Sequence, residues 1–264
     1  MLLGILVGHY FQEEAEALKE LIADKVDGVI SIPHAIGYYL NNIELYTELQ
    51  KNDCKIVFLL RNIKEVISTS VLPDEMYLIE QSMQALRARG CEHIIMIERE
   101  NSWMGNYRRN IFKFKYYKDA NCHHFGSENI DYRAAEDFSS VRDELEEKIN
   151  QLQIPADRKV GFMCLGGDQW VLPLWDIFCR REREMFHVVS EGQLRKQLQE
   201  QFDKRKIPDD LFLNDPIDFK GIKMGKTAIE HLVALVESNA VYSNTILVKP
   251  NINLKERNKK NETS

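Results

Sequence analysis

The sequence lacks three features that mark common classes of protein. None of its apolar runs is long enough to span a membrane, and the apolar start MLLGILVGHYF has no basic leader and is typical of a strand. Its five cysteines are widely spaced and form no CxxC pair, so we expect reduced thiols in a cytoplasmic protein. The net charge is −6, and the surface as a whole is therefore not one that attracts nucleic acid.

Sequence signatures of catalysis and of metal binding are also missing. The segment GIKMGKT has three residues between Gly221 and Gly225 where a phosphate-binding loop needs four, and it predicts the start of a helix instead. The seven histidines form no HExxH pattern, and no Ser, Cys or Lys lies in a context that would activate a nucleophile. We therefore expect no catalytic residue, no metal site and no cofactor, and a protein that is not an enzyme.

In the stretch LIADKVDGVISIP, a buried strand directly follows a helix. Apolar residues recur at helical spacing up to the first part of this stretch, while Val29, Ile30 and Ile32 form a short β-branched run. Asp27 and Gly28 make the tight joint between the two elements. A strand that is apolar on both faces is typical of a parallel sheet covered by helices.

The same alternation continues along the chain. Strands are predicted near residues 2–7, 28–32, 55–60, 66–70, 93–97, 121–125, 160–165, 186–190 and 245–249. Helices are predicted near residues 12–24, 41–51, 74–89, 104–118, 136–151, 169–183, 192–204 and 222–238. Strands that alternate with helices predict an α/β fold with parallel sheets.

Parallel sheets bind ligands at the carboxyl ends of their strands, so the residues that follow each strand are the candidate site residues. These residues are Pro33, His34, Arg61, Asp74, Trp103 to Arg108, Gly126, Gly166 to Trp170, and Glu191. The set combines planar hydrogen-bonding groups with aromatic faces, which is what a small polar ligand such as a sugar requires.

Two of these segments also have a purely structural interpretation. Asp168 opens a predicted helix, where an aspartate commonly caps free backbone N–H groups. The segment WMGNYRRNIFKFKYY interleaves aromatic and basic residues, as proteins that bind single-stranded nucleic acid do. Because the chain is acidic, we favour an amphipathic helix whose aromatic side chains pack against a sheet.

Several segments follow one another in the order found in a known family. LKELIADKVDGVISIP resembles that family's second helix and third strand, and SVLPDEMYLIEQSMQALRARGCEHIIMI resembles its aspartate, helix, glycine and crossing strand. NYRRNIF is similar to its Arg-x-x-Gly-aromatic helix start, and MCLGGDQWVLPLWDIF to its NDxxA joint. MGKTAIEHLVALV and TILVKPNINLKER resemble its closing helix, strand and arginine. The chain as a whole resembles the ligand-binding core of the lactose-repressor (LacI/GalR) family of bacterial regulators.

The resemblance implies a two-lobed α/β fold like that of periplasmic sugar-binding proteins, with each lobe a parallel sheet flanked by helices. It places residues 1–89 and 221–240 in an N-terminal lobe. It places residues 90–214 and 245–257 in a C-terminal lobe, followed by a disordered tail at residues 258–264. A small-molecule effector, expected to be a sugar, would bind in the cleft between the lobes.

The resemblance also implies roles for single residues. It puts Asp74 and Arg108 where the family commonly clasps ligand hydroxyls, and a carboxylate facing a guanidinium makes defined hydrogen bonds to a polyol. Arg61, Gly167, Asp168 and Glu191 lie near other lining positions, and His34 and Trp103 complete the candidate set by their places after strands. Ile111 and Gly167 replace the family's usual glycine and asparagine, and VVSEGQLRK departs from its GFDD pattern.

Compared with the family, the chain starts late. It has no counterpart of the family's helix-turn-helix or of its first strand and helix. Because that first strand belongs in the middle of a sheet, we expect its loss to leave a gap that the neighbouring side chains cannot close. The resulting hypothesis is a truncated or mis-started gene product that folds poorly when it is expressed alone.

The functional hypothesis is the sugar-responsive effector domain of a transcriptional regulator. We expect a cytoplasmic homodimer that contacts no membrane and reaches DNA only through a domain absent from this chain. The rival hypothesis is a transport-linked periplasmic sugar-binding protein, and a third is an enzyme on the same scaffold. Ligand-dependent release of DNA, export, and turnover of the ligand would distinguish the three.

Overall fold

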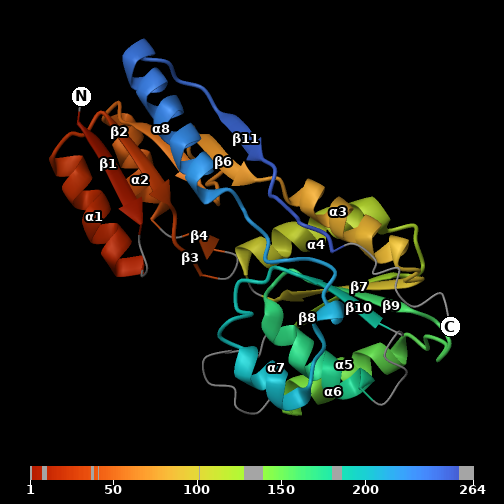
Figure 1. The fold of residues 1–264 in the computed structure, drawn as a ribbon. Helices are drawn as coiled ribbons and strands as arrows, with labels where there is room; N and C mark the ends of the chain where they lie inside the picture. Colours follow the sequence, from red (N-terminus) through yellow and green to blue (C-terminus); the bar gives the residue numbers. More distant parts are fainter. Residues whose placement is uncertain are drawn as a thin grey trace. The chain divides into compact units, whose positions relative to one another are not determined.

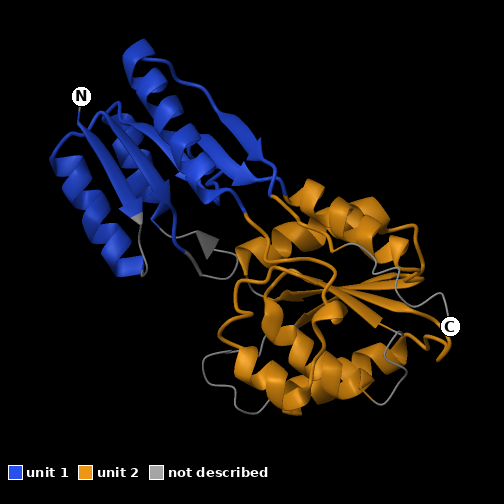
Figure 2. Cartoon of the chain, viewed as in Figure 1, with its two compact units in different colours: residues 1–74, 219–250 blue, residues 75–218, 251–264 orange. Residues whose placement is uncertain are grey.

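The chain folds into two compact α/β units, as the computed structural model shows (Figure 1). The first unit comprises residues 1–74 and 219–250, and the second comprises residues 75–218 and 251–264 (Figure 2). The structure describes residues 2–7, 11–36, 39–40, 42–100, 102–127, 139–179 and 186–255.

The first unit contains a five-stranded parallel sheet with the strand order β1-β2-β5-β6-β11. Its strands are β1 (Leu3–Val7), β2 (Gly28–Ile32), β5 (Lys55–Leu59), β6 (Thr69–Pro73) and β11 (Asn244–Val248). Its helices are α1 (Phe11–Ala23), α2 (Ile43–Lys51) and α8 (Gly221–Ser238). A short antiparallel pair, β3 (Ala35–Ile36) and β4 (Tyr39–Leu40), follows β2 and was not predicted.

Helices bury both faces of this first sheet. On one face, Leu18 of α1 and Tyr46 of α2 pack in one cluster with Phe58 of β5. On the other face, Leu232 of α8 packs in a second cluster with Val57, the neighbour of Phe58 in the strand. Successive residues of a strand point to opposite faces, so a strand that is apolar at every position needs cover on both sides.

The predicted gap in this sheet is wrong. Strand β1 pairs directly with β2 along its whole length, from Leu3 opposite Gly28 to Val7 opposite Ile32. β1 is therefore the edge strand, and the five described strands form one continuous hydrogen-bonded sheet. The backbone groups that a missing central strand would have left unpaired are satisfied by β1 itself.

The second unit contains a four-stranded parallel sheet with the strand order β10-β9-β7-β8. Its strands are β7 (His93–Arg99), β8 (Cys122–Ser127), β9 (Val160–Cys164) and β10 (Phe186–Ser190). Its helical segments are α3 (Glu75–Ala88), α4 (Trp103–Tyr116), α5 (Ser139–Gln151), η1 (Asp168–Trp170), α6 (Val171–Phe178), α7 (Gln199–Arg205) and η3 (Asp209–Leu211). Helices α3 and α4 cover one face of the sheet, and α5 and α6 cover the other (Figure 1). The predicted α/β class with two helix-flanked parallel sheets is confirmed.

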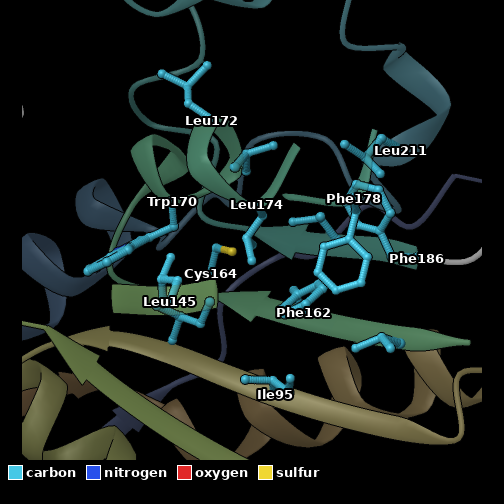
Figure 3. Packing of buried hydrophobic residues seen from close by; sticks show 14 of the residues in the cluster. Ile95, Leu145, Phe162, Cys164, Trp170, Leu172, Leu174, Phe178, Phe186 and Leu211 are labelled. Atoms are coloured by element: carbon cyan, nitrogen blue, oxygen red, sulfur yellow. The ribbon is translucent and has the colours of Figure 1, made fainter. Parts of the chain in front are cut away.

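An aromatic cluster fills the core between the second sheet and α6 (Figure 3). Phe162 of β9 is fully buried and meets Phe178 and Phe186 edge to face, with ring centroids 5.4 and 6.1 Å apart. Trp170, the last residue of η1, is fully buried in the same cluster. Edge-to-face aromatic pairs stabilise a core beyond the area they bury, so this cluster holds η1 and α6 firmly against the strand ends.

The units differ from the predicted lobes in two segments. Helix α3 belongs to the second unit because it packs on β9, where a Cβ at Gly161 would lie 3.0 Å from the side chain of Leu86. Strand β11 belongs to the first unit because it pairs in parallel with β6. The chain therefore passes between the units after Asp74, Asp218 and Pro250.

Most predicted element types are confirmed, while several ends move. Helix α8 begins at Gly221, so GIKMGKT starts a helix as predicted. The predicted helix at residues 192–204 is shorter and lies at Gln199–Arg205. In α4, Phe112 is buried but Phe114 is 79% exposed, so the aromatic side chains do not all face the sheet. The predicted tail at residues 258–264 lies outside the described residues.

Two predictions drawn from absences can be compared with the fold. Among the described residues, no helix combines the length and the apolar character needed to cross a membrane. The cysteines are free thiols; Cys54, Cys91 and Cys164 are buried, whereas Cys179 is exposed. Burial raises the pKa of Cys54 and of Cys91 to about 12, so these two thiols are unreactive packing groups at neutral pH.

Replacing Phe162 with alanine tests the aromatic core. We expect Phe162→Ala to lower the free energy of unfolding by about 3–5 kcal/mol, because it removes buried area and leaves a cavity among packed rings. Phe114→Ala makes the same chemical change at a side chain that is 79% exposed, and it should cost less than about 1 kcal/mol. Urea denaturation of both variants measures the difference, and equal costs would contradict the described packing.

Candidate functional site

Arg108 of α4 is a fully engaged arginine at the carboxyl end of the second sheet. Helix α4 is capped by Ser102, and the Arg108 side chain it carries is only 3% exposed. Its Nε donates to Oε2 of Glu75 at 2.6 Å and its Nη2 donates to Oε1 of the same residue at 3.1 Å. Its Nη1 donates to Oε1 of Glu191 at 2.7 Å and to the carbonyl oxygen of Leu165. Arg108 thus links α3, α4, the end of β9 and the segment after β10.

Glu98, near the end of β7, is the third carboxylate beside Arg108. Its Oε1 lies 3.6 Å from Nη1 of Arg108 and has no hydrogen-bond partner among the described residues. Burial raises the pKa of Glu98 to about 8, against the lowering effect of Arg108. Burial also raises the pKa of Glu191, although Arg108 donates to it. Conversely, burial lowers the pKa of Arg108, but its three carboxylate neighbours outweigh this and hold it well above the usual value.

Asp168 holds a loop instead of capping a helix. Its carboxylate is fully buried, and Oδ1 accepts from the hydroxyl of Ser190 at 2.6 Å and from the N–H of Gly192 at 3.1 Å. Oδ2 accepts from the N–H of Leu194 at 2.9 Å, and Nη2 of Arg195 lies 3.8 Å from Oδ1. The predicted cap is wrong, because these donors all belong to the segment at the end of β10 and after it. Asp168 therefore positions that segment.

Of the buried polar atoms at this end of the sheet that have no hydrogen-bond partner among the described residues, four belong to almost fully buried residues, and a fifth is Nε of Arg195. The four are Oε1 of Glu98, Nδ2 of Asn106, Oε1 of Gln169 and Nε1 of Trp170, and none of these residues is more than 9% exposed. Gly166 lies close to Glu98 and Trp170: a Cβ there would lie 3.1 Å from Oε2 of Glu98 and 3.3 Å from Nε1 of Trp170, nearer than side chains normally approach. Buried polar atoms are costly unless something binds them, so this set is the candidate ligand contact.

The second unit holds five of the residues predicted for the site, which are Trp103, Arg108, Gly167, Asp168 and Glu191. Arg108 and Glu191 are brought together, as their places after neighbouring elements predicted. Trp103 is half-buried and stacks on Tyr107, with ring centroids 5.5 Å apart. Gly167 has a φ of 127°, which glycine adopts readily, and it contributes only backbone. Arg108 and Asp168 both have protein partners, and their predicted roles in binding the ligand stay predictions.

The first unit holds His34 and Arg61, which meet at the loop after β2. The N–H of His34 donates to Oε1 of Glu14 at 2.9 Å. Nη1 of Arg61 donates to the carbonyl oxygen of Pro33 at 2.7 Å. Both residues lie at the carboxyl end of the first sheet, where the sequence predicted them.

Asp74 also belongs to the first unit, while the next residue, Glu75, belongs to the second. Asp74 follows β6, and its N–H donates to the carbonyl oxygen of Val248 at 2.9 Å. Glu75 starts α3, and its carboxylate accepts from the guanidinium of Arg108. Arg108 thus forms an ion pair within its own unit, and its predicted clasp with Asp74 around ligand hydroxyls stays a prediction.

Sequence reasoning missed a buried polar network in the first unit. Glu14 of α1 is fully buried and accepts from the Tyr46 hydroxyl at 2.7 Å and from Nδ2 of Asn42 at 2.8 Å. The hydroxyls of Tyr46 and Ser31 lie 2.5 Å apart, and burial together with Glu14 raises the pKa of Tyr46. One signal was present: Glu14 lies four residues before Leu18, on the same stripe of the helix.

Comparison with known proteins gives a clear answer at the level of fold. No protein-family model and no curated protein matches this sequence. An ABC-transporter solute-binding protein from Agrobacterium vitis with bound allitol matches at a TM-score of 0.64 and 11% identity, over 96% of this chain and 95% of that one. A LacI transcriptional regulator from Lactobacillus brevis matches at a TM-score of 0.61 and 12% identity, over 96% of this chain and 100% of that one. The trehalose repressor from Escherichia coli matches at a TM-score of 0.57 and 17% identity, over 92% of this chain and 84% of that one.

The chain has the fold of these proteins. This confirms the predicted periplasmic-binding-protein-like architecture, in which each unit is a parallel sheet flanked by helices. In open parallel α/β sheets, ligands bind at the carboxyl ends of the strands. In the second unit, that end carries Glu98, Gly166 and the ion pairs of Arg108.

The open polar atoms match hydroxyl groups. Oε1 of Glu98 and Oε1 of Gln169 are free to accept hydrogen bonds, while Nδ2 of Asn106 and Nε1 of Trp170 are free to donate them. A hydroxyl group does both, so a polyol can satisfy all four atoms. Within the described ranges, no group of three or more His, Cys, Asp or Glu side chains is placed to hold a metal ion.

The ion pairs of Arg108 predict a large stability effect. We expect Arg108→Ala to lower the free energy of unfolding by about 3–5 kcal/mol, because it leaves buried carboxylates without their cation. Arg158→Ala removes a half-exposed partner of Glu92 and should cost about 1 kcal/mol or less. Chemical denaturation at pH 7 measures both, and equal costs would contradict the described burial of Arg108.

Glu98 predicts a pH dependence of stability. Its pKa in the folded protein is about 8, above the ordinary value of 4.5, so the folded protein holds this proton more tightly than the unfolded chain does. The resulting stabilisation is complete below pH 4.5 and is lost as the pH rises through about 8. Glu98→Gln should remove this part of the decline, as followed by urea denaturation across that range.

The control for this experiment is Glu146→Gln, which removes one carboxylate from the exposed face of α5. Comparison of the two variants separates the effect of Glu98 from that of a change in net charge. A decline in Glu98→Gln as steep as that of the parent protein would contradict the described environment of Glu98.

Proposed function

We propose that this chain is the ligand-sensing domain of a sugar-responsive transcriptional regulator. The observation that carries the proposal is the set of four buried polar atoms without partners at the carboxyl end of the second sheet, in a fold shared with sugar-binding proteins. Two acceptors and two donors suit a molecule with several hydroxyl groups. The sensed ligand is therefore a sugar or a related polyol.

The ligand acts by binding alone in this proposal. Arg108 and Asp168 are saturated by protein groups, so neither is poised to move a proton to or from a ligand. The protein is accordingly not an enzyme and uses no cofactor. A ligand changes the state of such a sensor only by the difference in its affinity for two conformations, so the signal is a population shift.

The proposal extends to the assembly and the location of the protein. A regulator of this kind works as a homodimer in the cytoplasm, because DNA operators with two-fold symmetry are read by two-fold symmetric proteins. The net charge of −6 disfavours DNA contact by this chain as a whole, so the contact would come from a separate domain.

A transport-linked sugar-binding protein is the second candidate. The observation that favours it is the match to a transporter's solute-binding protein, which extends over 95% of that chain. Light scattering of the purified protein separates the two candidates. A stable dimer supports the regulator, and a monomer at every concentration and ligand level supports transport.

Removal of Oε1 of Gln169, one of the two acceptors without a partner, tests the location of the ligand site. Gln169→Met removes Oε1, which has no partner in the protein, and keeps the length of the side chain. We expect the variant to bind its sugar or polyol at least about tenfold more weakly, the loss of roughly one hydrogen bond, when binding is measured by calorimetry. The unliganded melting temperature should change little, since only the 3.1 Å bond from Nε2 to Gly166 is lost.

The matched control is Gln151→Met, at an exposed position at the end of α5. It makes the same chemical change away from the strand ends and should bind like the parent protein. Unaltered binding by Gln169→Met would remove this end of the second sheet from the ligand site. Failure of every sugar and polyol in a broad panel to bind the parent protein would overturn the proposed function.

A further inference from the structure

The polar cluster around Arg108 carries more negative than positive charge. Three carboxylates, those of Glu75, Glu98 and Glu191, share one guanidinium, so the group has a surplus of two negative charges when all are ionised. Arg109, the next residue of α4, donates to Asn106 at 2.5 Å and offsets one of these charges at most. Because the cluster is buried, water screens this surplus poorly.

The neighbouring carboxylate of Asp168 has a cation of its own. It is paired with Arg195 and accepts hydrogen bonds from the backbone N–H groups of Gly192 and Leu194. The surplus therefore belongs to the Arg108 cluster itself. Within that cluster, Glu98 is the member whose Oε1 accepts no hydrogen bond from the described residues.

Glu98 also lies beside the donors that suit hydroxyl groups. The carboxylate of Glu98 and the indole N–H of Trp170 are close neighbours, because a Cβ at Gly166 would lie 3.1 Å from Oε2 of Glu98 and 3.3 Å from Nε1 of Trp170. A carboxylate whose Oε1 accepts no hydrogen bond from the described residues thus adjoins an indole N–H that donates none to them. One ligand that carries a cationic nitrogen near a hydroxyl group would satisfy both.

We propose that the ligand of this site is a polyhydroxylated amine, such as an amino sugar or an amino alditol, whose ammonium group pairs with Glu98. This inference rests on the proposed function, since it names the class of sugar-like molecule that the sensor takes. An ammonium group donates to Glu98 and cancels part of the carboxylate surplus, while its hydroxyl neighbours meet Trp170, Asn106 and Gln169. Discrimination against a phosphorylated sugar follows from the same surplus, because a buried like charge is repelled.

Matched ligand series test the inference. One series is glucitol, 1-amino-1-deoxyglucitol and glucitol 6-phosphate, and two others are glucose and galactose with their 2-amino and 6-phosphate forms. Calorimetry on the full chain at pH 7 gives the affinity of each compound. In the series that binds, the amine should bind at least tenfold more tightly than the neutral parent compound, and the phosphate more weakly than both.

Variants locate the charge that sets this preference. Glu98→Gln should reduce the advantage of the amine over the neutral compound at least fivefold. Glu191→Gln, at a side chain that is 16% exposed, is the second variant and should reduce the advantage in the same direction. Glu146→Gln on the exposed face of α5 should leave the advantage unchanged.

The outcomes separate this inference from the proposed function. If the neutral or the phosphorylated compound binds as tightly as the amine or more tightly, the proposal of an amine ligand is wrong, while the proposed function as a sugar sensor is unaffected. An amine preference that persists unchanged in both Glu98→Gln and Glu191→Gln would overturn the assignment of the ammonium to this cluster. If no compound of these series and no member of the broad panel of sugars and polyols binds the parent protein, the proposed function and the inference fail together.

Discussion

The bidentate ion pair between Arg108 and Glu75 is the interaction on which the second unit depends. It joins the first turn of α3 to α4 in a place where both side chains are almost fully buried. Arg108 also reaches Leu165 after β9 and Glu191 after β10, so one guanidinium ties together the two helices on one face and two strand ends. Burying these charges is costly, and only a set of hydrogen bonds this complete offsets the cost.

The same pairing decides which atoms remain for a ligand. Arg108 donates hydrogen bonds to Glu75, Glu191 and Leu165, while Oε1 of Glu98 beside it accepts no hydrogen bond from the described residues. Burial then favours the protonated form of Glu98, and a cationic partner would favour the ionised form. A ligand that supplies such a partner gains energy here that a neutral ligand does not. Selectivity at this site thus follows from the unequal division of one guanidinium among three carboxylates.

The fold was predictable from sequence because its signals are local. The alternation of apolar strands with amphipathic helices fixed the α/β class, and the order of the motifs pointed to the two-unit architecture. The division into units was less accurate, since local pattern does not reveal on which sheet a helix packs. The local sequence pattern of helix α3 fits either lobe, and its packing against α4, β9 and β10 assigns it to the second unit.

The sequence predicted where the site residues lie, but not which of them bind one another. Strand ends pointed to Arg108, Asp168 and Glu191, but not to Glu75, the carboxylate that accepts two hydrogen bonds from the arginine. One residue along a helix turns a side chain by roughly 100°, so the identity of the partner depends on where α3 begins. Glu14 shows the same limit, because a glutamate on a helix surface and one in a buried network have identical local sequence signals. Partners that are distant in sequence decide which charged groups stabilise the fold and which remain available to a ligand. In this protein those partners bind Arg108 and leave Oε1 of Glu98 without a hydrogen bond.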